Sequence, residues 1–298
     1  MANSIELFKK YVPLLDEVYK LSSLTSDLDG APELARQGQN ANELIIPKID
    51  MSGLANYSRN GGYVDGDVTF TNETVKCNFD RGRMFTVDTL DNMETAMMAF
   101  GRLASEFIRT KVTPEIDAFR FATYASISGI GTTAAAALST GANVITALRD
   151  AVNTMDEAEV PSTERYLYIT PTLLGLVRDL DTSKSKEVLD GFAKIVKVPQ
   201  SRFYTAIKQL SGKVETVSSS SDDQTAGGYK KADSAKNINF MIIHKPAVIQ
   251  YQKHVAPKVI TPEQNQDADA WKFGYRNVGI ADVYENKVAG IYLHKAAS

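Results

Sequence analysis

The sequence has little of the chemistry on which enzymes and metal proteins depend. It contains one cysteine, Cys77, and three histidines, His244, His254 and His294. One cysteine excludes an intrachain disulfide and a cysteine-cluster metal site, which fits a reducing compartment. The histidines lie in or next to expected strands, and no two of them stand four residues apart on a helix as a zinc-binding pair does. We therefore interpret them as structural residues and predict that no metal is bound.

The chain also lacks a basic excess and a long apolar run. Its formal net charge is -3 and its pI is about 5.7, whereas duplex-binding proteins usually carry surplus cations for phosphates. Residues 1–7 lack the basic and apolar regions of a signal peptide. The uncharged segment 121–148 is interrupted by Gly129, Gly131 and Gly141, so it is not expected to span a membrane.

Two patterns come close to a functional motif. Residues 129–134, Gly-Ile-Gly-Thr-Thr-Ala, match a loose dinucleotide-binding pattern, but they follow an expected helix instead of a strand. Asp80, Asp88 and Asp91 are near one another, and paired carboxylates can carry acid–base chemistry. We expect these aspartates in turns and at a helix cap, and Cys77 as an inert packing residue in a strand. The sequence therefore predicts a protein that is not an enzyme and binds no cofactor.

The N-terminus carries an amphipathic helical pattern over residues 5–24, followed by a polar segment, 25–42, that is expected to be a flexible connector. An apolar stripe on such an arm needs a partner surface, either the chain's own core or a neighbouring subunit. The stripe consists of Ile5, Phe8, Val12, Leu15 and Tyr19.

Within residues 43–87 the sequence predicts a short strand at 44–49, a strand at 68–79 with alternating apolar residues, and a last strand at 84–87. The pattern predicts a long hairpin with a turn-rich tip, residues 56–63, that holds few large apolar side chains. Pro47 suggests an edge position for the first strand. An isolated two-stranded hairpin is marginal in water, so we expect a surface outside its own domain to hold it.

Residues 88–126 form the longest helical pattern of the chain. Asp91 is the expected N-cap, and Glu94 completes a capping box. Pro114 is expected to bend or restart the helix. A helix of this length reaches about 50 Å and would act as a spine.

The rest of the chain predicts a mixed α/β region and a return of strands. Residues 142–260 combine helices and strands, with a low-complexity segment at 218–236 that is expected to be a loop. Residues 271–295 alternate again, with a hairpin turn at Asn286–Lys287, and are expected to pack on the spine helix. The expected elements between them are helices at 143–159 and 171–180 and strands at 166–169, 238–243 and 255–260.

The order of these parts resembles the major capsid protein of tailed bacteriophages, the Hong Kong 97-type fold that encapsulin shells share. The resemblance covers nearly the whole chain. The segments that carry it are Ile45–Asp50, Leu54–Tyr63, Thr74–Lys76 through Asp80–Gly82, Phe85–Asp88, Arg165–Pro171, Val198–Phe203 and His244–Ala247.

The resemblance implies an α+β fold with four parts. They are an N-terminal arm (1–42), an extended β-hairpin E-loop (43–87), a P-domain with the spine helix and returning strands (88–141 and 261–298), and a mixed α/β A-domain (142–260). In this family the E-loop lies over a neighbouring subunit, and the A-domains meet around five-fold and six-fold axes. Candidate interface residues are therefore Asn56, Tyr57, Arg59, Asn60, Gly61, Gly62 and Tyr63 of the hairpin, with Phe8, Val12 and Leu15 of the arm.

The implied function is structural. The chain would self-assemble, as hexamers and pentamers, into the icosahedral shell that encloses the DNA genome of a tailed phage, and it would be assembled in the host cytoplasm. The implied partners are a separate scaffolding protein, since no long N-terminal scaffolding segment is seen, a portal, possible decoration proteins, and packaged double-stranded DNA through weak, non-specific contact. Two alternatives stay open, an encapsulin-like compartment and an α/β enzyme with residues 43–87 as a lid.

Overall fold

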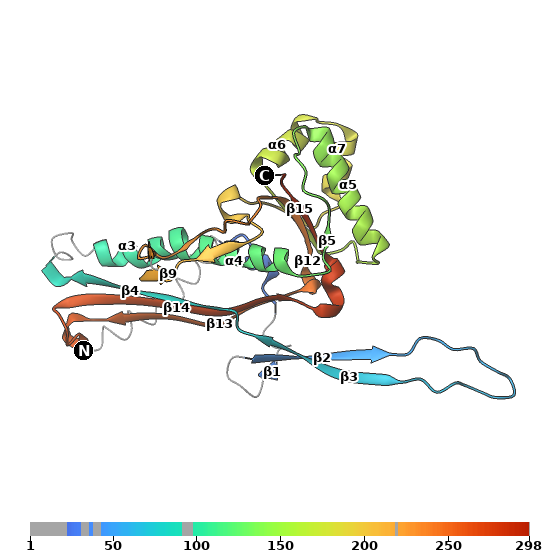
Figure 1. Cartoon of the computed structure of the whole chain (residues 1–298), viewed down its shortest axis with the longest axis horizontal. Coiled ribbons are helices and arrows are strands. Elements are labelled where there is room, and N and C mark those ends of the chain that lie inside the picture. The colour runs from blue at the N-terminus through green and yellow to red at the C-terminus, as the bar shows by residue number, and fades with distance from the viewer. Residues whose placement is uncertain (1–22, 31–35, 38–42, 91–97, 218–219, 298) are drawn as a thin grey trace.

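The structure, a computed structural model, describes residues 23–30, 36–37, 43–90, 98–217 and 220–297. Phe8, Val12 and Leu15 of the expected arm helix, and the expected cap Asp91, lie outside the described residues. Figure 1 shows two β-sheets beside one long helical segment, and a hairpin that projects beyond them. No helix in the described part of the chain is long and apolar enough to cross a membrane.

The first sheet is antiparallel, in the order β13, β14, β4. These strands are β13 (Val248–Ile260), β14 (Ala270–Val283) and β4 (Phe79–Asp88). Side chains alternate between the faces of a strand. Phe273 and Tyr275 of β14 are buried on the face that packs against Ile108 and Ile116 of the helical segment.

The helical segment is continuous from Met98 to Ser126 and confirms the expected spine. It consists of α3 (Met98–Phe107), a π-helical turn η3 (Ile108–Val112) and α4 (Thr113–Ser126). Pro114 has no N–H, and its ring would clash with a carbonyl one turn earlier in a regular α-helix. The wider π-turn directly before it provides room, so the segment passes Pro114 without ending.

The second sheet has the order β5, β15, β12, β6, β7. It is mixed: β5 runs parallel to β15 and β7 parallel to β6, while β12 is antiparallel to both of its neighbours. Its strands are β5 (Gly131–Thr132), β15 (Ile291–Lys295), β12 (Ile238–His244), β6 (Arg165–Ile169) and β7 (Lys194–Lys197).

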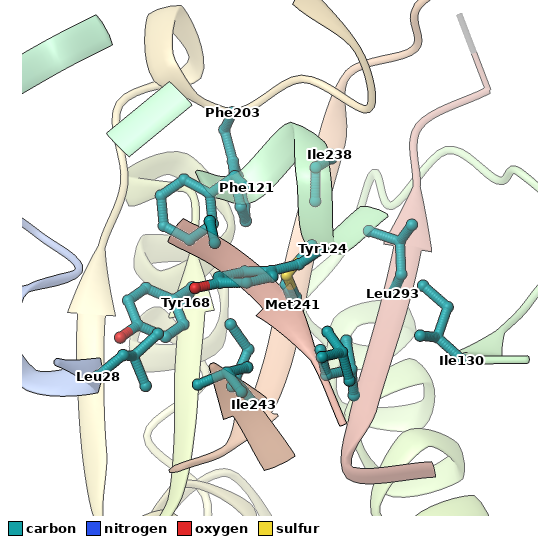
Figure 2. Packing of buried hydrophobic residues seen from close by; sticks show 14 of the residues in the cluster. Leu28, Phe121, Tyr124, Ile130, Tyr168, Phe203, Ile238, Met241, Ile243 and Leu293 are labelled. Atoms are coloured by element: carbon teal, nitrogen blue, oxygen red, sulfur yellow. The ribbon is translucent and has the colours of Figure 1, made fainter. Parts of the chain in front are cut away.

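Both faces of this second sheet are covered, which explains the almost unbroken apolar sequence of β12. One face packs against α5 (Gly141–Glu157) and α6 (Pro171–Asp179), with α7 (Ser183–Asp190) beside them. The other face packs against α4. Phe121 and Tyr124 lie among Tyr168, Phe203 and Met241 in Figure 2, and the Phe121 ring is 5.2 Å from Tyr168 and 4.9 Å from Phe203. The spine is therefore the common support of both sheets.

Strand pairing corrects the expected course of the C-terminal strands. No hairpin forms at Asn286–Lys287, because a short helical segment, η7 (Glu285–Gly290), carries the chain from β14 to β15 in the other sheet. Ile291 and Leu293 of β15 still reach the cluster around Phe121, so the expected packing on the spine is confirmed. The boundary expected between residues 260 and 261 falls between β13 and β14. These two strands pair with each other in one sheet, so the boundary does not separate two structural units.

Two other expectations were also wrong in part. Residues 79–88 leave the hairpin and pair with β14 as β4, so the projecting hairpin ends before residue 79. The segment 218–236, expected to be a loop, contributes two strands. Two small antiparallel pairs result: β10 (Ser220–Asp223) with β9 (Val214–Val217), and β11 (Tyr229–Lys231) with β8 (Ile207–Gln209).

The remaining short elements connect the larger ones. They are η1 (Ser26–Leu28), β1 (Arg36–Gln37), η4 (Gln200–Arg202), η5 (Lys245–Ala247) and η6 (Pro262–Gln264). β1 pairs with the first strand of the hairpin.

Candidate subunit interface

The projecting hairpin consists of β2 (Glu43–Met51) and β3 (Val68–Lys76). Directly opposed residues of an antiparallel pair lie on the same face. Met51 is opposite Val68, and Ile49 is opposite Phe70, so these four side chains form one apolar face. They are 65%, 70%, 57% and 64% exposed, respectively. The outer half of the hairpin therefore carries an apolar face that nothing in the described chain covers.

The opposite face of the same outer half is polar. Asp50 pairs with Thr69, and Thr71 follows on the same face, all three exposed. An antiparallel ribbon with one apolar and one polar face is the pattern of a sheet that covers another surface with one side. We name Ile49, Met51, Val68 and Phe70 the hairpin face.

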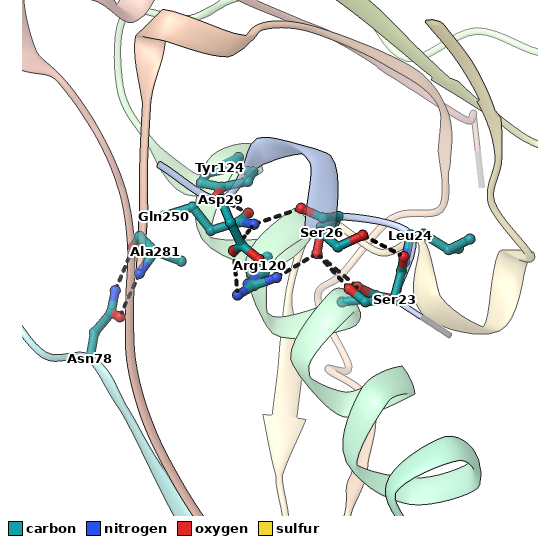
Figure 3. Close-up of polar contacts among 11 residues, drawn as sticks. Ser23, Leu24, Ser26, Asp29, Asn78, Arg120, Tyr124, Gln250 and Ala281 are labelled. Atoms are coloured by element: carbon teal, nitrogen blue, oxygen red, sulfur yellow. Dashed lines mark hydrogen bonds and ion pairs between the residues drawn. The ribbon is translucent and has the colours of Figure 1, made fainter. Parts of the chain in front are cut away.

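The root of the hairpin is fixed to the body. Val75 is 4% exposed and packs with Ile249 and Ile280 of the first sheet. Just beyond it, Asn78 Nδ2 donates to the Ala281 carbonyl at 2.6 Å, and the Ala281 N–H donates to Asn78 Oδ1 at 3.1 Å (Figure 3). The hairpin thus has a firm base, while its outer half extends away from the body (Figure 1).

The tip holds a small folded turn. Ser58 and Gly62 exchange backbone hydrogen bonds of 2.8 and 3.2 Å, and the Tyr57 and Tyr63 rings lie 4.9 Å apart. Gly62 has a φ of +76°, a conformation that favours glycine. Gly62 is half-buried in this turn, and the other predicted hairpin residues, Asn56, Tyr57, Arg59, Asn60, Gly61 and Tyr63, are exposed.

The tip, residues 56–63, holds two large aromatic side chains, Tyr57 and Tyr63, and apolar Leu54 and Val64 flank it. Leu54 is fully exposed, and Tyr57, Tyr63 and Val64 are 60%, 89% and 65% exposed. The hairpin face was not expected from the sequence. Ile49 and Met51 alternate in one strand and Val68 and Phe70 in the other, but only the register shows that they share a face.

The root of the N-terminal arm, residues 23–30, is held in the body, although residues 25–30 were expected to be part of a flexible connector. We name this segment the clasp. The carboxylate of Asp117 in α4, which has no exposed surface, accepts hydrogen bonds from Ser23 Oγ at 2.9 Å, Thr25 Oγ1 at 2.8 Å and the Leu24 N–H at 3.0 Å. Arg202 lies 3.2 Å from the same carboxylate. These contacts place the clasp in the body, so the arm as expected at 1–42 is interrupted at 23–30.

Further contacts hold the other end of the clasp (Figure 3). Arg120, 3% exposed, donates to Thr25 Oγ1 at 2.8 Å and pairs with Asp29 at 3.2 Å. Gln250 Nε2 donates to Asp29 Oδ1 at 2.7 Å, and Tyr124 donates to Gln250 Oε1 at 2.7 Å. The clasp thus connects the spine helix to β13.

Two arginines on one face of β4 bind backbone carbonyls at both ends of the segment 210–228. Arg81 donates to the carbonyls of Leu210 at 2.8 Å and Gly228 at 3.2 Å. Arg83 donates to the carbonyls of residues 225 and 226 at 3.0 and 3.2 Å. We name these two residues the arginine latch. Arg81 also lies 2.8 Å from Glu115 of the spine helix. Burial raises the pKa of Glu115, although the Arg81 charge opposes this shift.

The remaining candidate residues have structural surroundings. His244 and His294 are buried, and burial lowers the pKa of each. Asp80 forms an ion pair with Arg276 at 2.6 Å, and Asp88 accepts from the Leu90 N–H at 2.9 Å. Within the described ranges, no three His, Cys, Asp or Glu side chains are grouped as metal ligands would be. Cys77 packs at the hairpin root beside Val75.

Comparison with solved structures identifies the fold. The chain is similar to the structure of Mycobacterium phage Che8, with a TM-score of 0.55, 14% identity, and coverage of 86% of this chain and 85% of that one. It is similar to the capsid of Cyanophage P-SCSP1u, with a TM-score of 0.55, 13% identity, and coverage of 88% and 86%. A virus-like particle from Pyrococcus furiosus matches with a TM-score of 0.57, 14% identity, and coverage of 97% and 99%.

No protein-family model and no curated protein sequence matches the chain. The structural similarity extends over most of the chain and of each matched structure. The expected fold is therefore confirmed: the chain has the α+β fold of Hong Kong 97-type capsid proteins.

Proposed function

We propose that this protein is the major capsid protein of a tailed bacteriophage, a structural subunit that assembles with copies of itself into an icosahedral shell around the genome. The capsid fold supports the proposal over most of the chain. The observation that carries it furthest is the hairpin face. Ile49, Met51, Val68 and Phe70 are each more than half exposed on a ribbon that leaves the body, and a neighbouring copy would cover them.

Covering by a second copy also explains how a two-stranded hairpin with an exposed apolar face can be stable. Two-stranded ribbons are marginal in water unless a further layer covers their apolar face. A second copy supplies that layer only in the assembly, so ordering of the outer hairpin and association of subunits would be linked. The proposed contact is reciprocal around a ring, because each copy offers one hairpin and receives another.

The finer assignments are part of the same proposal. We keep the division into arm, E-loop, P-domain and A-domain and change two boundaries. The E-loop ends at residue 76, because β4 pairs with β14, and β13 belongs to the P-domain, because it also pairs with β14. Hexamers and pentamers, a separate scaffolding protein, a portal, decoration proteins and weak contact with packaged DNA are the proposed partners. The virion is the proposed location.

An encapsulin-like compartment is the second candidate. The observation that favours it is the match to the Pyrococcus furiosus virus-like particle over 97% of this chain. The enzyme alternative requires residues 43–87 to close over a cleft, but β2 and β3 point away from the body in Figure 1. The position of the hairpin therefore does not support a lid over a cleft.

Electron microscopy and sedimentation of the purified chain test the proposal. Closed shells or capsomer-sized rings are expected. A monomer or dimer at every protein and salt concentration would contradict it. Nucleic acid of genome length inside the particles favours the phage capsid, whereas shells that enclose a co-expressed protein favour the compartment.

A further inference from the structure

A groove runs between the spine helix and the segment 210–228. It is lined by α3 and η3 of the spine, by β4 and β14 of the first sheet, and by residues 210–213 and 226–231. Its volume is about 1280 Å³, above the range of roughly 300–1,000 Å³ that is usual for small-molecule pockets. The arginine latch binds both ends of the segment 210–228. The single chain therefore forms the groove, with room for a small molecule and part of its water shell.

The groove carries a positive charge that the chain itself does not neutralise. Six cationic and three anionic side chains line it. Each anion forms an ion pair with an arginine, and the three anions are Asp80, Glu106 and Glu115. Within the described part of the chain, Lys111, Lys213 and Lys230 form no ion pair, and all three are exposed. A ligand with several negative charges is the complement of these lysines.

Aromatic side chains form the apolar part of the lining at one end of the groove. The ring centres of Phe85 in β4 and Phe107 in α3 lie 4.7 Å apart, with the ring planes at 72° to each other. Leu103 of α3 lines the same part of the groove. Both rings are half-buried, so each keeps a surface that a ligand can contact. A flat unsaturated ring packs well against such side chains.

A buried amide lies farther along the groove. Asn277 is four residues beyond Phe273, the partner of Phe85 in the sheet, so the groove extends about 13 Å along β14. Asn277 is 2% exposed, and its Nδ2 has no hydrogen-bond partner among the described residues. A donor that is buried without an acceptor costs free energy, and an oxygen atom of a ligand would recover that cost.

We infer that the groove binds a nucleoside phosphate, with the base on Phe85 and Phe107 and the phosphates extending toward Asn277. The three exposed lysines supply the opposite charge, and Asn277 Nδ2 donates to a phosphate oxygen. A nucleic-acid duplex has the charge, but its bases are stacked in pairs and offer no free ring. The carboxylates of an acidic peptide carry no ring. The inference goes beyond the proposed function, since it requires only the folded chain and not a shell.

Calorimetric titration of the purified chain with three probes in magnesium-free buffer tests both halves of the ligand. ATP is expected to bind. Adenosine lacks the phosphates and tripolyphosphate lacks the base, so each is expected to bind roughly tenfold more weakly or worse. Amide hydrogen exchange locates the site, because a ligand that binds the folded groove protects the segments that line it. ATP is expected to slow exchange at residues 103–112 and 210–228.

Neutralising the lysines tests the charge. The chain with Lys111→Gln, Lys213→Gln and Lys230→Gln is expected to bind ATP roughly tenfold more weakly or worse. The control carries Lys184→Gln, Lys197→Gln and Lys236→Gln, which are exposed lysines outside the groove, and is expected to bind ATP as the wild type does. Thermal unfolding without ligand checks that both variants fold. If the groove variant does not fold, the three probes and the exchange pattern of the wild type still decide.

Four results would overturn the inference. They are no binding at millimolar ATP, tripolyphosphate that binds as tightly as ATP, protection by ATP outside the groove alone, and equal loss of ATP binding in the groove variant and the control. A single-stranded oligonucleotide or a polyglutamate peptide that binds far more tightly than ATP would assign the groove to that partner instead. The proposed function is tested separately, because shells can form with or without ATP binding.

Discussion

Asp117 and Thr25 are separated by 92 residues of chain, and the Thr25 hydroxyl donates a 2.8 Å hydrogen bond to the Asp117 carboxylate where neither residue is exposed. This contact is the centre of the clasp. Asp117 lies on the spine helix, and the clasp precedes the hairpin in the sequence. The hydrogen bond therefore holds the chain on the body at a point before the hairpin begins. The clasp belongs to the isolated subunit and does not need a neighbour.

Replacing Asp117 by alanine should destabilise the unassembled subunit by about 3 kcal/mol. The substitution leaves the Ser23 and Thr25 hydroxyls, the Leu24 N–H and Arg202 without their buried acceptor. Urea unfolding measures the change. Glu106→Gln is the control: it breaks an exposed ion pair with Arg109 and should cost less than about 1 kcal/mol. Equal effects of the two substitutions would contradict the role of the clasp.

Gly227→Ala should loosen the segment 210–228. Gly227 has a φ of +67°, and a Cβ there would lie 2.5 Å from Arg83 Nη1, so the substitution strains the backbone and displaces the latch. The expected cost is about 1–2 kcal/mol. Faster amide hydrogen exchange at residues 210–228 is the expected sign that the segment is held less firmly.

The matched control for the latch is Gly175→Ala. Nothing lies within 4 Å of a Cβ at Gly175, which is inside α6, so alanine should raise stability slightly there. Unchanged exchange at 210–228 in the Gly227 variant would show that the latch does not hold the segment.

Local patterns in the sequence were sufficient for much of the fold. The helical pattern over 98–126, the strand Tyr166–Ile169 and the alternation in 68–76 depend on neighbouring residues, and the structure confirms each of them. Pairing partners were harder to predict. The local sequence of β4 looks like that of another hairpin strand. β4 pairs with β14 instead, because Phe79 and Phe85 pack against the spine helix there.

The candidate interface was predictable only in part, for a related reason. The turn at 56–63 has a strong local signal in Gly61 and Gly62, whereas the hairpin face emerges only when two strands are placed in register. Residues 25–30 of the clasp were expected to be a flexible connector because most of them, Thr25 and Ser26 among them, are polar. Their partner Asp117 is far away in sequence, so the burial of that network could not be inferred from composition.

Stability should fall as the pH drops below about 6.5, with His294 among the causes. Asn239 Nδ2 lies 3.0 Å from His294 Nδ1 and also donates to the Ala136 carbonyl, so the ring nitrogen acts as an acceptor and must be neutral. Burial lowers the pKa of His294 in the folded chain. In the unfolded chain the His294 imidazole has an ordinary pKa of about 6.5, so it takes up a proton at a higher pH than it does in the folded chain. The folded state therefore loses stability as the pH falls from about 6.5 through the lowered pKa of the folded chain.

His294→Gln should flatten this dependence, because glutamine offers an acceptor that does not titrate. Free energies of unfolding between pH 5 and pH 8 measure it, by urea titration of wild type and variant. An identical slope in the two proteins would contradict the assignment to His294.

The central claim is that a second copy covers the hairpin face, and one sedimentation comparison tests it directly. The variant carries threonine at positions 49, 51, 68 and 70, which keeps strand propensity and removes apolar surface that is already exposed in the single chain. The control carries Thr69→Ser and Thr71→Ser on the opposite face. The account predicts shells for wild type and control, and soluble, folded subunits with unchanged unfolding temperature but no shells for the four-threonine variant. Shells of normal size and yield from that variant would contradict it.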